Sequence, residues 1–471
     1  VWAMNPDKAP RAGQGGGWEE SSPAAPARLV SVSTRVNPIR PEQFLRRAKG
    51  AERFFWREAD AAQTLAGMGI AAEIFAWGQS RFADVETQTR ALFANAILDE
   101  SAPAPALMGG FAFRDDFVPD NTWAAFHPAH FVLPHLQLTE GAGGETWLTL
   151  NALAAPDEPI RELRGSLKQA LAARAAWLMA HDEADAAAIP ENAQTEITYP
   201  MSLASWTVML HEAIRRIQNG ELKKVVLARM CELRGKQPLD VDRAMAFLND
   251  HYAGCYRFLF EPRPGHAFLG ATPELLARVN GRELRTMALA GSQKRGRTAE
   301  EDAALERDFL SNAKELHEHA LVADMLRERL EPHVRELDMP DAPETLKLSN
   351  IMHLHTPVQA ELNEASGVLP MVALLHPTPA LGGSPRETAL EFIRENEPIT
   401  RGWYAAPIGV LHAGADGALD GAFAVAIRSA VAQHERAWLY AGCGVVGQSI
   451  PQNEWAETAL KFKPMLNAFG S

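Results

Sequence analysis

Four glutamates form two E-x-x-E pairs whose spacing is suited to binding a cation. The pairs are Glu315/Glu318 and Glu454/Glu457, each in a segment with a helical pattern. Residues three apart share one face of a helix, so each pair can direct two carboxylates toward one point. Oxygen ligands suit Mg²⁺, which often uses only one or two protein carboxylates. Most such pairs are simply solvated, so a magnesium site depends on what else the chain places around them.

Candidates for proton transfer and anion binding stand beside expected strands. Lys224 begins the apolar run VVLA, and Glu274 follows a strand and a proline turn in GATPELL. Either could face a cleft, although such residues are usually solvated. Arg428 interrupts the apolar strand FAVAIRSAV, where a buried cation needs a partner. That partner could be an anionic ligand or a nearby glutamate.

Two glycine-containing segments could bring backbone N–H groups close to an anion. One is the AGS stretch at 290–292, directly after an expected strand. The other is a G-x-G-x-x-G stretch that begins at Gly442. A dinucleotide site is disfavoured there, because Pro451 interrupts the expected helix start and too few residues follow to complete a βαβ unit. Backbone binding of an anion is the better interpretation.

Two histidines and a cysteine adjoin these segments. His376 is expected to be a satisfied core or turn residue, whereas His353 could equally well line a site. Cys443 has no evident histidine partner, so we expect it to pack rather than to act as a nucleophile. The chain has 3 cysteines and no C-x-x-C, which indicates neither a zinc site nor a disulfide framework.

The composition is typical of a soluble globular protein, and the odd, low cysteine count fits a reducing cytoplasm. The formal net charge of −13 argues against nucleic acid as a partner, but a small anion needs only local positive charge. No apolar run reaches the roughly 18 residues that would suggest a membrane span.

The chain divides into a leader and two regions. Residues 1–28 are rich in Gly, Pro, Ala and Ser, which is typical of a disordered leader. An N-terminal α+β region follows over 29–198 and ends after a polar, Ala-rich linker at about 182–190. The second region covers 199–471. Hairpins interspersed with helices predict an α+β fold with largely antiparallel sheets.

Local signals in the second region position the candidate residues. Asn312 could cap the helix that carries the first glutamate pair, within a stretch expected to be helical over about 302–334. Asn280-Gly281 predicts a hairpin turn. A final helix from about Gln452 would carry the second glutamate pair and Lys461.

The order of short blocks in the second region resembles the chorismate-utilising enzymes, which are the isochorismate, salicylate, anthranilate and aminodeoxychorismate synthases. These blocks include KKVVLAR, GATPELL, LAGS, KELHEHALV, HLHTP, LLHPTPALGGSPRETALEFI, RGWYAAPIG, AIRSA and AGCGVVGQSIPQNEWAETALKF. The N-terminal region resembles the variable part of the family and contributes only RFFW, GGFAF and FVLP. The resemblance implies large, mostly antiparallel sheets flanked by helices.

The resemblance also implies a reaction on chorismate, a dianion that gains a hydroxyl at ring C2 and loses one from C4. Lys224 would be the base that activates water, and Glu274 would be the acid that protonates the leaving oxygen. Mg²⁺ would be held by Glu318 and Glu457.

The other residues would support the metal or contact the substrate. Glu315 and Glu454 would support the magnesium site. The residues expected to contact chorismate are Ala290, Gly291, Ser292, His353, Ala380, Leu381, Arg428, Gly442, Gly444 and Lys461.

Two positions separate the members of the family. Lys224 resembles the lysine that the water-using enzymes of the family carry at this position, whereas anthranilate synthases typically carry glutamine there. At Ala290, aminodeoxychorismate synthases place a nucleophilic lysine. The resemblance therefore implies an isochorismate synthase. A salicylate synthase, which also eliminates pyruvate, is the alternative, and anthranilate synthase component I is less favoured.

Partners and pathway are expected from the same resemblance. We expect no obligatory amidotransferase subunit and either a monomer or a weak homodimer. Several blocks look closer to the menaquinone type than to the siderophore type.

Overall fold

The computed structural model describes residues 27–180, 195–414 and 417–470. The expected leader lies outside these ranges except for its last two residues, of which Arg28 begins the first strand. The expected linker at 182–190 lies outside them as well. Among the described residues, no helix combines the length and apolar composition that a membrane crossing requires.

The strands of the described chain form one continuous network. Every pairing between them is antiparallel, in agreement with the sequence prediction. The strands are β1 Arg28–Val36, β2 Arg53–Arg57, β3 Gln63–Ala76, β4 Ala106–Phe111, β5 Ala129–Gly141, β6 Thr146–Ala154, β7 Thr195–Thr198, β8 Lys224–Gly235, β9 Tyr256–Arg263, β10 His266–Thr272, β11 Leu275–Asn280, β12 Glu283–Lys294, β13 Val334–Asp338, β14 Glu344–Lys347, β15 Ile351–Leu362, β16 Gly383–Ser384, β17 Pro407–Ala413, β18 Leu419–Val425, β19 Ser429–Gln433 and β20 Arg436–Val445.

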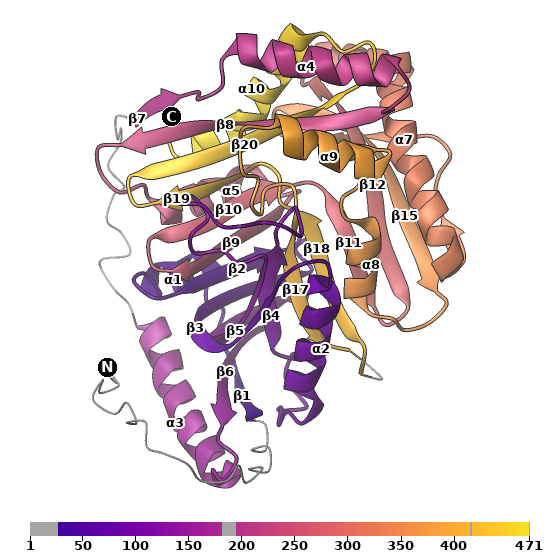
Figure 1. The fold of residues 1–471 in the computed structure, drawn as a ribbon. Coiled ribbons are helices and arrows are strands. Elements are labelled where there is room, and N and C mark those ends of the chain that lie inside the picture. Colours follow the sequence, from indigo (N-terminus) through magenta and orange to yellow (C-terminus); the bar gives the residue numbers. More distant parts are fainter. Residues whose placement is uncertain (1–26, 181–194, 415–416, 471) are drawn as a thin grey trace, which may run out of the picture.

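The network has two arms that meet at β5 (Figure 1). One arm runs β5–β3–β2–β9–β10–β19–β20–β8. The other runs β5–β4–β17–β18–β11–β12–β15. The pairings β2–β9 and β4–β17 therefore join the two predicted regions. Both arms end in strands of the second region.

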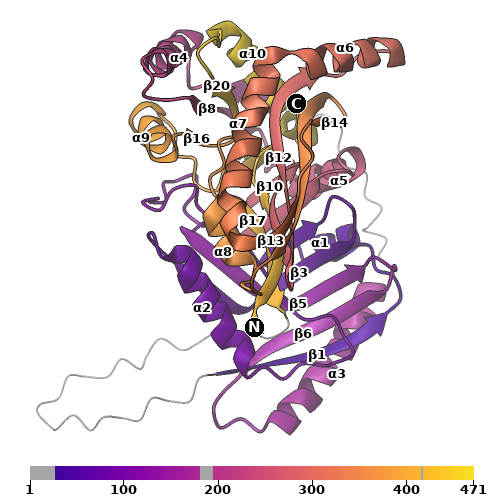
Figure 2. The same cartoon turned by 90° about the vertical axis from the view of Figure 1, so that its right-hand side faces the viewer.

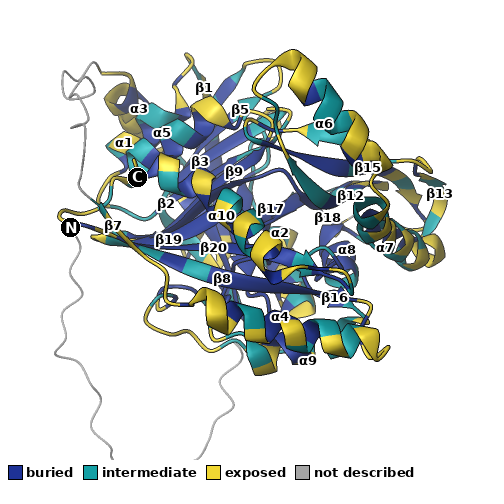
Figure 3. Ribbon diagram, turned by 90° about the horizontal axis from the view of Figure 1, so that it is seen from above, coloured by how far each residue is buried: buried dark blue, intermediate teal, exposed yellow. Residues whose placement is uncertain are grey.

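Helices cover the outside of the strand network, where Figure 3 shows their exposed faces. Helix α10 packs on β20, and α7 packs on β12 and β15, as Figure 2 also shows for α7. These two helices carry the glutamate pairs. The α-helices are α1 Pro41–Arg47, α2 Arg81–Ala94, α3 Ile160–Met179, α4 Leu203–Gln218, α5 Val241–His251, α6 Ala299–Ser311, α7 Ala313–Leu330, α8 Val368–Leu375, α9 Arg386–Asn396 and α10 Pro451–Ala468.

Asn312 caps α7, as its position in the sequence predicts. Its side chain accepts hydrogen bonds from the backbone N–H groups of Lys314 and Glu315. The prediction of one helix over 302–334 is wrong, because the extended backbone of Asn312 ends α6 and begins α7. The cap holds Glu315 and Glu318 within the first two turns of a fixed helix.

Two further local predictions need small corrections. The predicted hairpin joins β11 and β12, but its turn residues are Gly281 and Arg282, because Asn280 pairs with Glu283. Pro451 does not interrupt α10 but is its first residue, where a missing N–H costs no intrahelical hydrogen bond.

Aromatic side chains from both regions fill the largest core cluster. Trp123 packs edge-on against Phe268, and Phe260 lies between Phe54 and Trp403. All five are buried. Large buried aromatic side chains dominate core energetics, so this cluster holds the N-terminal strands against the second region.

Candidate active site

A pocket lies where the ends of the two arms approach each other, between β8/β20 and β12/β15, with α7 and α10 beside it. It contains about 630 Å³ of space between atoms, part of which is open to solvent. Its lining residues are Lys224, Val226, Glu274, Leu289, Ala290, Gly291, Ser292, Glu318, His353, Ala380, Leu381, Tyr404, Ile427, Arg428, Tyr440, Ala441, Gly442, Cys443, Gly444, Glu457 and Lys461.

The first pair in this pocket joins β8 to α7. The ammonium group of Lys224, which is fully buried, donates a hydrogen bond to Glu318 Oε1 at 2.7 Å. Burial disfavours the charged form of Glu318, but Lys224 and other cations outweigh it and lower the pKa of that carboxyl. Gly444 makes room for the pair, because a Cβ there would lie 2.4 Å from Glu318 Oε1 and 2.8 Å from Lys224 Cε.

Glu274 is a buried carboxyl group held between β10 and β11. Burial raises the pKa of Glu274 to about 8, although Lys224, Lys461 and Arg428 act in the opposite direction. A carboxyl group with such a pKa is mostly protonated at neutral pH and can donate a proton. The sequence prediction of an acid at this position thus has a physical basis in the fold.

Arg428 and His353 form a fixed pair on another wall. Arg428 is buried and has a positive φ of 51°, between β18 and β19. Its Nη2 lies 3.1 Å from His353 Nε2, and His353 Nδ1 lies 2.7 Å from the Gly291 carbonyl oxygen. Burial lowers the pKa of His353 to about 3, so the imidazole is neutral. Its Nδ1–H therefore donates to Gly291, and its Nε2 accepts from Arg428.

The AGS segment does not lie after a strand, where the sequence predicted it. Residues 290–292 do not follow the strand but lie within β12, where the register shifts between Ala290 and Gln293. Gly291 has a positive φ of 69° in this irregularity, and a Cβ there would lie 2.7 Å from Glu315 Oε2. A larger residue would therefore collide with the start of α7.

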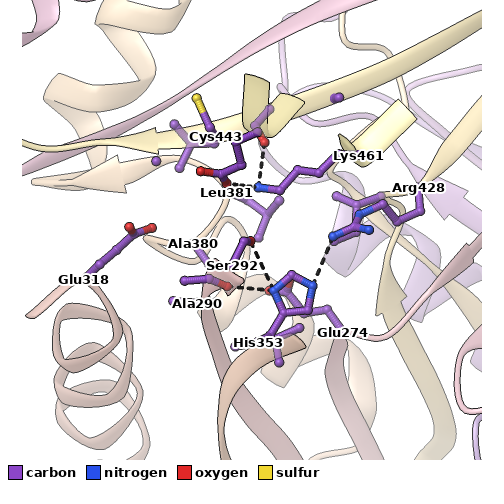
Figure 4. A pocket seen from close by; sticks show the side chains of 18 of the residues that line it. Glu274, Ala290, Ser292, Glu318, His353, Ala380, Leu381, Arg428, Cys443 and Lys461 are labelled. Carbon is purple, nitrogen blue, oxygen red and sulfur yellow. Dashed lines mark hydrogen bonds and ion pairs between the residues drawn. The ribbon is translucent and has the colours of Figure 1, made fainter. Parts of the chain in front are cut away.

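Lys461 enters the pocket from α10 (Figure 4). Its ammonium group donates to Glu457 Oε1 at 2.6 Å and to the Gly442 carbonyl oxygen at 3.0 Å. Burial opposes its charge, but Glu457 outweighs burial and raises the pKa of Lys461. Gly442 and Gly444 lie in β20 rather than in a loop, with Cys443 between them.

The remaining two glutamates lie just outside the pocket lining. Lys314 approaches Glu454 at 3.3 Å and Glu315 at 4.0 Å. Burial and then Glu318 raise the pKa of Glu315, and burial and then Glu457 raise the pKa of Glu454.

The four carboxylates therefore crowd one another, and added positive charge would relieve that repulsion. Within the described ranges, no three His, Cys, Asp or Glu side chains converge as a ready-made metal cage. The arrangement fits a Mg²⁺ ion that takes one or two carboxylates and fills its other positions with water and substrate.

Apolar and aromatic side chains complete the pocket walls. Ala380 and Leu381 come from the loop before β16, and Ile427 precedes Arg428. Tyr404 and Tyr440 stack with ring centroids 5.3 Å apart. Such walls suit the apolar faces of a small ring-shaped ligand.

The fold brings together all but two of the site residues named from the sequence, and those two, Glu315 and Glu454, adjoin the rest. His376 is a buried histidine that contacts the Phe113 carbonyl oxygen at 3.0 Å, as expected of a core residue. Sequence reasoning missed Lys314, which bridges two helices. Its position beside Glu315 was visible, but its partner Glu454 is 140 residues away.

The class of protein follows from this fold and site together with the family comparison. The family model described as "Chorismate binding enzyme" matches residues 19–470. The chain therefore belongs to the chorismate-binding enzyme family.

Two curated relatives give a finer comparison. The "Salicylate biosynthesis isochorismate synthase" of Pseudomonas aeruginosa is 36% identical, over 94% of this chain and 90% of its own length. The "Isochorismate synthase MenF" of Bacillus subtilis is 34% identical, over 94% of this chain and 93% of its own.

Solved structures share the fold. The menaquinone-specific isochorismate synthase MenF from Escherichia coli superimposes with a TM-score of 0.78 at 23% identity, covering 96% of this chain and 97% of that one. Anthranilate synthase component I from Streptococcus pneumoniae has a TM-score of 0.67 at 21% identity, covering 96% and 95%. The α+β architecture of chorismate-utilising enzymes, expected from the sequence, is confirmed.

Proposed function

We propose that this protein is an isochorismate synthase, which converts chorismate to isochorismate by adding water at C2 and releasing the C4 hydroxyl. One observation carries the proposal: an amine, Lys224, and a carboxyl group with a pKa of about 8, Glu274, face the same buried pocket. The names of the two curated relatives support it, since both are isochorismate synthases.

Glu274 acts as the acid in this proposal. Hydroxide is a poor leaving group, so the C4 oxygen must receive a proton as its bond to carbon breaks. Burial keeps Glu274 protonated at neutral pH, and the C4 hydroxyl therefore leaves as water.

Lys224 acts as the base. It takes a proton from the water molecule whose oxygen bonds to C2, and the proton given up by Glu274 is thereby balanced. Lys224 must be neutral to do so, and its nitrogen is hydrogen-bonded to Glu318. The base thus becomes available when Glu318 turns to another partner.

A buried cation and nearby backbone groups would bind one of the two carboxylates of the substrate. Arg428, fixed by His353, would bind the carboxylate of the enolpyruvyl side chain. Gly291 and Gly442 line the same pocket, and their backbone groups would contribute to binding this carboxylate.

Glu318 and Glu457 would hold Mg²⁺, with Glu315 and Glu454 in support. When bound, the ion would supply positive charge for the ring carboxylate. Lys461 lies one turn from Glu457 and would orient its carboxylate.

The proposed product is isochorismate rather than salicylate. Leu381, Tyr404 and Ile427 are bulky and line the pocket, so they would restrict the side-chain pose that pyruvate elimination needs. Incubating the protein with chorismate and Mg²⁺ tests the proposal. Unchanged chorismate would refute it.

A further inference from the structure

A buried ion pair lies directly behind two walls of the pocket. The side chains of Glu397 and Arg401 are 2% and 3% exposed, and they are joined by two hydrogen bonds, of 2.8 Å from Arg401 Nε to Glu397 Oε2 and of 2.5 Å from Arg401 Nη2 to Glu397 Oε1. Neither residue lines the pocket. Glu397 caps the end of α9, and Arg401 lies in the segment before β17.

The pair also binds backbone groups of two pocket segments. Arg401 donates to the Leu381 carbonyl oxygen at 3.0 Å and to the Val226 carbonyl oxygen at 2.8 Å. Glu397 Oε1 accepts from the backbone N–H of Ala228 at 2.7 Å. Val226 and Leu381 both line the pocket.

The pair thereby takes the place of a neighbouring strand along β8. One edge of β8 pairs with β20. Within the described chain, the other edge has short pairings with β7 and with β16 at Gly383–Ser384, extended by a hydrogen bond from the Val226 N–H to the Gly382 carbonyl oxygen at 2.9 Å. Between these, the outward Val226 carbonyl and Ala228 N–H would lack partners without Arg401 and Glu397. Because β8 carries Lys224 at its start, the pair locks the strand of the proposed base against the wall that contains Leu381.

Stability alone gives little reason for such a pair. The cost of desolvating two buried charges commonly offsets their attraction, so apolar residues would often serve the fold as well. The pair contributes a defined orientation instead. The planar guanidinium group of Arg401 binds a carboxylate and two carbonyl groups in one fixed geometry.

We propose that Glu397 and Arg401 are positioning residues that set the spacing between β8 and the loop at 380–382, and with it the width of the pocket. The expected effect on chorismate turnover rests on the proposed function, whereas the role of the pair in setting the spacing between β8 and the loop does not.

The test compares variants of the pair with a matched buried arginine. Arg401→Lys keeps the charge but loses the fork, and Glu397→Gln places an amide against Arg401. The control is Arg53→Lys, because Arg53 is also buried, binds Glu261 and Asp242, and donates to the Leu45 carbonyl oxygen, remote from the pocket.

Two quantities are measured for variants that fold and have similar melting temperatures: the KM for chorismate and the rate of amide hydrogen exchange. In the variants of the pair we expect KM for chorismate to rise on the order of ten-fold, with a smaller fall in kcat, since small misplacements of pocket walls are costly. Amide hydrogen exchange should increase over 225–229 and 380–384. The control should leave both unchanged.

Equal KM and equal exchange in Arg401→Lys and Arg53→Lys would overturn the proposal. If Arg401→Lys and Glu397→Gln do not fold, Glu397→Asp, which keeps the charge but withdraws from Ala228, decides by the same criteria. If the wild-type protein does not convert chorismate, the proposed function fails, and hydrogen exchange alone decides the role of the pair.

Discussion

The ammonium nitrogen of Lys224 lies 2.7 Å from a carboxylate oxygen of Glu318, so the proposed base donates a hydrogen bond directly to a proposed metal ligand. Glu318 cannot bind Lys224 and the proposed metal ion equally well at the same time. Substitutions at either residue should therefore affect catalysis and metal binding in different proportions, which makes the two roles separable.

Lys224→Ala should lose on the order of 10²–10⁴-fold in kcat, because the water would lack its base. Chorismate binding, measured by calorimetry, should weaken much less. The control is Lys223→Ala, since the neighbouring lysine is exposed. Near-normal turnover in Lys224→Ala would remove this residue from the mechanism.

The pH dependence of the activity should follow the ionisation of Glu274. Its pKa is raised to about 8 by burial, and its protonated form is the active one. Activity should thus be present below that pH and fall as pH rises through it. Glu274→Gln should lose most of its kcat with little change in KM, whereas the exposed Glu283→Gln should match wild type. A full rate maintained well above pH 9 would contradict the assignment.

Removal of the metal should abolish turnover, and added Mg²⁺ should restore it. Glu318→Ala and Glu457→Ala should weaken Mg²⁺ binding in calorimetry by about ten-fold or more, as losses of metal-site partners typically do. Glu315→Ala and Glu454→Ala should have smaller effects, because neither residue lines the pocket. Full activity in excess chelator would disprove the metal assignment.

Gly444→Ala tests how closely the Lys224–Glu318 pair approaches β20. The added Cβ would lie 2.4 Å from Glu318 Oε1, so the pair must move, and kcat/KM should fall about ten-fold or more. In the control, Gly447→Ala, the nearest atom would be 3.7 Å away, and activity should be retained. Equal activities would show that the pair tolerates displacement.

The sequence predicted those features of the site that depend on local spacing. Glu315 and Glu318 share a helical face, Asn312 caps that helix, and the apolar run after Lys224 forms a strand. Each depends on residues a few positions apart.

Features that depend on distant segments could not be predicted in this way. Arg401 binds the carbonyl oxygen of Val226, 175 residues away. The need for Gly444 arises because the side chains of Glu318 and Lys224, from two distant segments, approach it closely. The strand pairings between the two predicted regions are equally invisible to local patterns.

The most direct test of the account is to identify the product made from chorismate with Mg²⁺ at neutral pH. Chromatography should show isochorismate as the dominant product, little pyruvate, and strongly reduced conversion in Glu274→Gln. Salicylate and pyruvate appearing in equal amounts, at the rate of chorismate loss, would contradict the proposed reaction and identify a salicylate synthase instead.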